Sequence, residues 1–76
     1  MKNIKVLGGG CRNCLTTYEL IRKTAEESGV EVVLEKVEDM AQIMSYGVMS
    51  TPAVVIDGQV VHAGGIPDRK TIASWL

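Results

Sequence analysis

Many of the apolar residues of this chain are grouped in four short runs along the sequence. Residues 3–7, 31–37, 53–56 and 59–63 each contain a run rich in valine, isoleucine or leucine. Runs of this length bounded by glycine or polar residues are typical of strands. The last two runs are separated only by Asp57-Gly58. This dipeptide between two apolar runs predicts a hairpin closed by a type I′ turn.

A helical stripe follows the first run. The spacing i, i+4, i+7, i+11 predicts a helix from Leu15 to about Ser28. Gly29 is a suitable residue to end it. The stripe consists of Cys14, Tyr18, Ile21 and Ala25.

A second, short helix is predicted between Asp39, a good N-cap residue, and Gly47. Met40, Ile43 and Met44 have the i, i+3, i+4 spacing of an apolar stripe, and we expect them to pack into the core rather than to bind a soft metal.

The last helix is predicted from Asp68 to Leu76, with Pro67 in its first turn. Its apolar face consists of Ile72, Trp75 and Leu76. The element order is therefore β-α-β-α-β-β-α, an α/β arrangement. The first two strands should be parallel with a right-handed crossover, and the hairpin should add an antiparallel pair.

Composition narrows the possible functions. The 76 residues make one small domain with a formal charge of −1, which gives no electrostatic reason to expect binding to nucleic acid or an anionic membrane. No apolar run reaches the ~18 residues of a membrane span. Residues 1–3 do not resemble a signal peptide. We expect a cytoplasmic monomer.

The chain has two cysteines, Cys11 and Cys14, directly after Gly8-Gly9-Gly10. They lie where a strand leads into a helix, and the helix N-terminus offers free N–H groups and a positive dipole. These effects stabilise a thiolate at Cys11, and the thiolate is the nucleophile in disulfide exchange. Cys14 lies one turn further on the same face, so it can attack a mixed disulfide formed at Cys11.

Together, the first strand, this Cys-x-x-Cys and Thr51-Pro52 before an apolar hairpin resemble the thioredoxin fold. The chain is most similar to the very small thioredoxin-like or glutaredoxin-like redox-active disulfide proteins of archaea and bacteria. The resemblance covers residues 1–76 as a single domain. It implies a minimal thioredoxin fold, with a four-stranded mixed sheet and helices on both faces.

The same resemblance implies a thiol–disulfide oxidoreductase whose only redox group is the Cys11–Cys14 pair. Its implied partners are protein disulfides and a thioredoxin-reductase-like electron donor. It also implies that Pro52 is cis and that the Thr51 backbone pairs with substrate. The expected substrate-binding residues are Gly10, Arg12, Asn13, Thr51, Pro52, Gly64 and Gly65.

The residues around the cysteine pair differ from those of thioredoxin. Gly10 stands where thioredoxins have tryptophan, and Arg12-Asn13 stands where they have Gly-Pro. The first strand also lacks thioredoxin's buried acid, since Lys5 is its only ionisable residue within 3–7. Glu35 and Lys36 are expected to be solvated edge residues, so no proton acceptor for Cys14 is identified.

Two other functions use the same residues. Two thiolates could bind Cu(I) in a heavy-metal-associated module, but such modules usually carry Met where this chain has Gly9, and they end in a strand. A glutaredoxin-like activity would use residues 64–68, which resemble a glutathione carboxylate site. His62 has no second histidine to form a metal pair, so we expect an exposed strand residue and no metal site.

Overall fold

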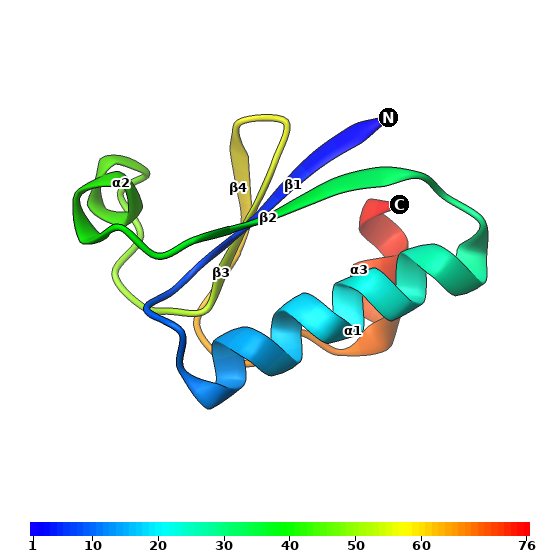
Figure 1. Ribbon diagram of the computed structural model, residues 1–76, viewed down its shortest axis with the longest axis horizontal. Helices are drawn as coiled ribbons and strands as arrows, with labels where there is room; N and C mark the ends of the chain where they lie inside the picture. The colour runs from blue at the N-terminus through cyan, green and yellow to red at the C-terminus, as the bar shows by residue number, and fades with distance from the viewer.

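The computed structural model describes all residues 1–76 and contains four strands and three helices (Figure 1). They are β1 (Lys2–Leu7), α1 (Arg12–Ser28), β2 (Val32–Val37), α2 (Met40–Ser45), β3 (Ala53–Ile56), β4 (Gln59–Ala63) and α3 (Arg69–Trp75). The order is the β-α-β-α-β-β-α that the sequence predicted. Element boundaries differ from the predicted ones by a few residues, most of all at the start of α1.

The four strands form one mixed sheet in the order β2-β1-β3-β4. β1 is parallel to β2 and antiparallel to β3, and β3 is antiparallel to β4. The β3–β4 hairpin turns at Asp57 and Gly58, whose φ angles are 50° and 83°. Positive φ at both central residues is the type I′ geometry, so the predicted turn is confirmed.

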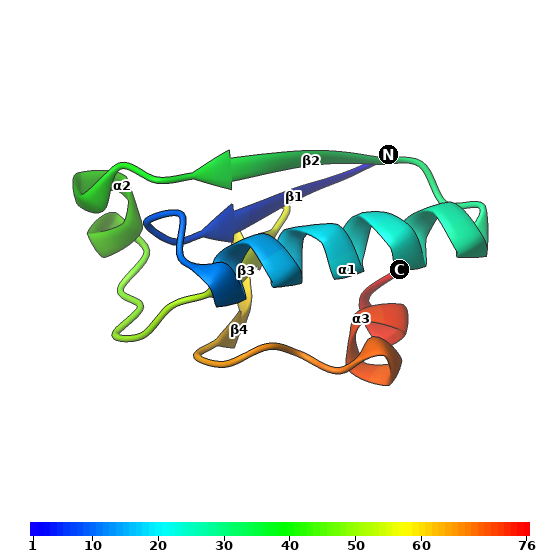
Figure 2. The same cartoon turned by 60° about the horizontal axis from the view of Figure 1, so that its bottom comes forward.

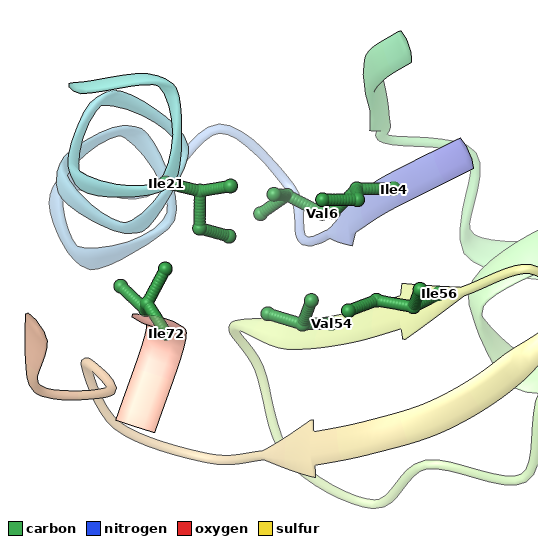
Figure 3. Packing of buried hydrophobic residues seen from close by; sticks show 6 residues of the cluster. All are labelled: Ile4, Val6, Ile21, Val54, Ile56 and Ile72. Carbon is green, nitrogen blue, oxygen red and sulfur yellow. The ribbon is translucent and has the colours of Figure 1, made fainter. Parts of the chain in front are cut away.

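The larger core cluster lies between the sheet and helices α1 and α3. Figure 3 shows Ile21 of α1 pointing toward Val6 of β1, and Ile72 of α3 pointing toward Ile21, within the same cluster. The buried members are Ile4, Val6, Ile21, Val54, Ile56 and Ile72. Alternate strand residues point to opposite faces, so Ile4 and Val6 face the helices whereas Lys5 and Leu7 face away.

A second cluster lies on the opposite face, under the short helix α2. It consists of Leu7, Val37, Ile43, Ala53 and Val55. Helices therefore cover both faces, as predicted. The expectation that Met40 and Met44 pack into the core is wrong, because they are 64% and 68% exposed. A six-residue helix directs only one side of its single full turn at the sheet, and Ile43 alone occupies that side.

Helix α1 differs from its predicted stripe in two ways. Its buried residues include Thr17 and Thr24, whereas Tyr18 is only half-buried. Lys36 of β2 places its Nζ 4.7 Å from the centre of the Tyr18 ring, so the ring lies at the sheet edge under a cation. The buried face of α1 therefore contains two threonines in place of the tyrosine that the apolar pattern predicted.

Candidate active site

The candidate site lies at the end of the molecule where β1 and β2 both finish and α1 begins (Figure 2). The Gly8 N–H donates a 3.0 Å hydrogen bond to the Val37 carbonyl, which ties the turn after β1 to the end of β2. Gly10 has a φ of 82°, a left-handed conformation that glycine adopts without steric cost. This turn redirects the chain into α1.

Cys11 is the N-cap of α1, which is why the helix begins at Arg12 rather than at Leu15. Its Sγ accepts a 3.1 Å hydrogen bond from the backbone N–H of Cys14. The Cys11 carbonyl accepts the first helical bond, 3.0 Å from the Leu15 nitrogen. The Cys11 sulfur therefore lies at the positive end of the helix dipole, where negative charge is stabilised.

The two cysteines are joined by a disulfide, with their Cα atoms 5.0 Å apart. Cys11 is exposed, whereas Cys14 is 5% exposed. An incoming sulfur can therefore reach Cys11 from solvent, but it meets protein in front of Cys14.

Gly8 packs directly against the inner cysteine. A Cβ at this position would overlap the Cys14 Sγ, and it would lie 3.8 Å from the Thr51 Cβ. The absence of a side chain at Gly8 therefore makes room for the disulfide, and Thr51 lies beside the same glycine.

Thr51 is exposed, Pro52 is buried, and the peptide bond between them is cis. The Pro52 carbonyl accepts a 2.9 Å hydrogen bond from the Gly64 N–H. A Cβ on Gly64 would come within 2.8 Å of the Ser50 Oγ, so these two loops pack closely. The structure thus joins the Thr51–Pro52 segment to the glycine turn after β4.

The remaining expected binding residues lie on the surface at the ends of these segments. Gly10, Arg12 and Asn13 are exposed at the start of α1, and Gly65 is exposed after β4. His62 is half-buried rather than exposed, which corrects the sequence-based expectation. Its Nε2 lies 3.0 Å from the Gly65 carbonyl and its ring lies 6.1 Å from that of Trp75, so it supports the turn.

The start of α3 is already capped by the chain itself. The Asp68 carboxylate accepts a 2.7 Å hydrogen bond from the Thr71 N–H. Hydrogen bonds from Thr71, through its side chain and its backbone, hold the pKa of the Asp68 carboxyl below its ordinary value. A glutathione carboxylate would have to compete with this anion, which disfavours the glutaredoxin-like alternative.

Sequence reasoning did not identify Glu38 or Gly8 as residues of the site, and it treated Lys36 as a solvated edge residue. A small cavity beside the disulfide is lined by Val6, Gly8, Gly10, Cys14, Leu15, Lys36 and Glu38. Lys36 shares the α1 side of the sheet with Leu34, which packs against the α1 cluster, because side chains on β2 alternate. Glu38 follows the last residue of β2 and lines the same cavity. The period-2 pattern could have placed both residues there, once α1 was known to cover that face.

No group of three or more His, Cys, Asp or Glu side chains is arranged to share a metal ion. None of the three helices combines the length and the apolar character needed to cross a bilayer.

Comparisons with known proteins agree with this geometry. A family model described as a thioredoxin domain matches residues 2–76. A thioredoxin from Methanocaldococcus jannaschii is 38% identical over 73 residues, which cover 96% of this chain and 84% of the relative. A thioredoxin from Methanothermobacter thermautotrophicus is 29% identical over 76 residues, covering 100% of this chain and 99% of the relative. A probable thioredoxin from the same organism is 31% identical over 65 residues, or 82% of this chain and 75% of the relative.

Proposed function

The chain belongs to the thioredoxin family and is a thiol–disulfide oxidoreductase, and on this premise we propose that its cysteine pair reduces disulfide bonds of cytoplasmic proteins. The observation that carries the proposal is the pairing of an exposed Cys11 with a buried Cys14 at a helix start. Such a pair needs no further cofactor, because the two sulfurs carry the electrons themselves.

The reaction proceeds in two exchanges. The Cys11 thiolate attacks one sulfur of the substrate disulfide, which forms a mixed disulfide and releases the other substrate sulfur as a thiolate. Cys14 then loses its proton and attacks the Cys11 sulfur, which releases the second substrate thiolate. Two electrons pass to the substrate, its two thiolates take up two protons, and the Cys11–Cys14 disulfide remains.

The Thr51–Pro52 segment is proposed to hold the substrate. Thr51 is exposed beside the cysteine pair, so an extended peptide can pair with its backbone as an added strand. Gly64 supports this segment through the hydrogen bond from its N–H to the Pro52 carbonyl, and we propose that Gly64 and Gly65 line the substrate site beside it. Gly10, Arg12 and Asn13 are proposed to contact the substrate near the Cys11 sulfur.

We propose that a thioredoxin-reductase-like donor restores the dithiol and that the protein acts as a monomer. A redox-buffer series with thiol trapping would measure the reduction potential of the pair. A value near −270 mV, as in thioredoxin, supports the reductive direction, whereas a value near −120 mV contradicts it.

The roles of the cysteines can be tested by trapping. Cys14→Ser should accumulate a mixed disulfide with a disulfide-containing protein such as insulin, because nothing resolves it. Cys11→Ser should accumulate none, since its remaining thiol is buried. The wild-type protein should reduce insulin with dithiothreitol as electron donor, and an inactive wild type or preferential trapping by Cys11→Ser would contradict the proposal.

A further inference from the structure

The two-step reaction does not say which group takes the proton from the buried Cys14 sulfur. Cys14 must lose a proton before it can attack the mixed disulfide, yet it is 5% exposed and β1 carries no acid near it. The inference below rests on the proposed function and names the group that receives this proton.

The cavity beside Cys14 limits the candidates. Apart from Cys14, its lining includes two ionisable side chains, Lys36 and Glu38, both from β2 or its end. Lys5 places its Nζ 3.4 Å from the Tyr46 hydroxyl on the α2 side of the sheet. Glu35 lies at an alternate strand position, so its side chain leaves the sheet on the side away from α1. Of these groups, Glu38 is the acid that lines the cavity.

Two glycines keep the space between the carboxylate and the sulfur clear. A side chain at Gly8 would overlap the Cys14 Sγ. A Cβ on Gly10 would lie 2.8 Å from a carboxylate oxygen of Glu38, closer than real Cβ contacts. The cavity that both residues line has a volume of about 10 Å³, which is the lower limit for holding one water molecule. A proton can cross such a gap through a single water.

The backbone fixes Glu38 at this place. Val37, the preceding residue, accepts the 3.0 Å hydrogen bond from the Gly8 N–H, so the end of β2 is tied to the glycine turn. Lys36 adds a positive charge to the same cavity and lies over the Tyr18 ring of α1.

We propose that the Glu38 carboxylate accepts the Cys14 proton, through one water, when Cys14 resolves the mixed disulfide. The S–H bond of Cys14 breaks, the new Cys11–Cys14 bond forms, and the substrate sulfur leaves with the electron pair. Glu38 then passes the proton to solvent or to the leaving thiolate. In the reverse direction a thiolate of the electron donor attacks Cys11, and Glu38 supplies the proton to the departing Cys14 sulfur.

The test separates the two steps with the chromogenic disulfide 5,5′-dithiobis(2-nitrobenzoate). Reduced protein mixed with this reagent in a stopped-flow instrument releases one coloured thiolate when Cys11 attacks and a second when Cys14 resolves. The second phase is intramolecular, so its rate does not depend on reagent concentration. Glu38→Gln should slow this phase about tenfold, below the ~10²–10⁴-fold typical of general bases because Glu38 is exposed and water can partly replace it.

The pH profile distinguishes proton transfer from a structural effect. Glu38→Gln should make the rate of the second phase depend more steeply on hydroxide concentration, while the first phase stays unchanged. Glu38→Asp should recover part of the rate. Glu35→Gln, an equal charge change at an exposed position on the other face of β2, is the matched control and should match wild type.

The remaining outcomes of this experiment would contradict either the role of Glu38 or the proposed function. An unchanged second phase in Glu38→Gln rejects the proton-acceptor role and leaves the oxidoreductase function intact. A faster second phase shows that the carboxylate acts only by repelling the Cys14 thiolate. Absence of the first phase in the wild-type protein contradicts the proposed function itself.

Discussion

Gly8→Ala should make the cysteine pair a stronger oxidant. The added methyl group would overlap the Cys14 Sγ and lie 3.1 Å from its Cβ. In the oxidised protein the bond to Cys11 fixes this sulfur, so it cannot move away from the methyl. In the reduced protein the Cys14 side chain is free to rotate to another rotamer. The substitution therefore destabilises the oxidised form more than the reduced form.

The size of the effect follows from the cost of overpacking. Inserting a methyl group into a well-packed site costs about 1–3 kcal/mol. If this cost falls wholly on the oxidised form, the potential rises by about 20–65 mV, since 30 mV corresponds to ~1.4 kcal/mol for a two-electron couple. The same free-energy difference should appear as a lower stability of the oxidised variant in urea.

The measurement is the equilibrium fraction of disulfide in a series of glutathione buffers, quenched with acid and alkylated. Gly9→Ala is the matched control, because no atom lies within 4 Å of a Cβ at that neighbouring glycine. Its potential should equal that of wild type. A Gly8→Ala potential that is unchanged or lower would refute the steric reasoning, and so would an equal shift in Gly9→Ala.

Three further predictions concern single side chains. Arg12→Ala should lower the potential by at most ~20 mV at low salt, because an exposed cation contributes under ~1 kcal/mol to the Cys11 thiolate; no change at low salt, or a rise, would reject this role. Thr17→Val should raise the free energy of unfolding in urea by about 1 kcal/mol, since the buried Thr17 hydroxyl has no hydrogen-bond partner; a loss of stability would mean that it has one. Asp68→Ala should lower the thermal midpoint at neutral pH. Because the pKa of Asp68 is lower in the folded protein, its carboxylate stabilises the fold fully above the unfolded pKa of ~3.9, and this stabilisation is lost as the pH falls through the folded pKa. The variant lacks this contribution, so it should lose less stability than wild type between pH 5 and pH 2.

Much of the fold was predictable because its local signals agree with one another. The four apolar runs, the Asp57-Gly58 turn and the N-cap residue Asp39 each indicated an element or boundary that the structure contains. The start of α1 was missed because cysteine is not a usual N-cap. Its Sγ nevertheless accepts the Cys14 N–H as a serine oxygen would.

The errors arose where tertiary packing decides exposure. Met40 and Met44 have helical spacing, but a six-residue helix covers too little of the sheet to bury them. Glu38 could not be placed at the site from its own neighbours, because its position depends on which face of β2 is covered by α1. The contact between Gly8 and Cys14 is likewise a property of the folded turn, and three consecutive glycines alone do not identify which one meets the sulfur.

The division between exposed and buried residues at the site has a consequence for how this protein can diversify. The framework of the site consists of glycines, a buried proline and backbone hydrogen bonds, whereas the side chains of Arg12 and Asn13 are exposed at its surface. Substitutions at such surface positions usually change stability by no more than ~0.5 kcal/mol. The proposed contact residues Arg12 and Asn13 can therefore be replaced without a loss of folding, so the surface around Cys11 is free to change while the scaffold stays the same.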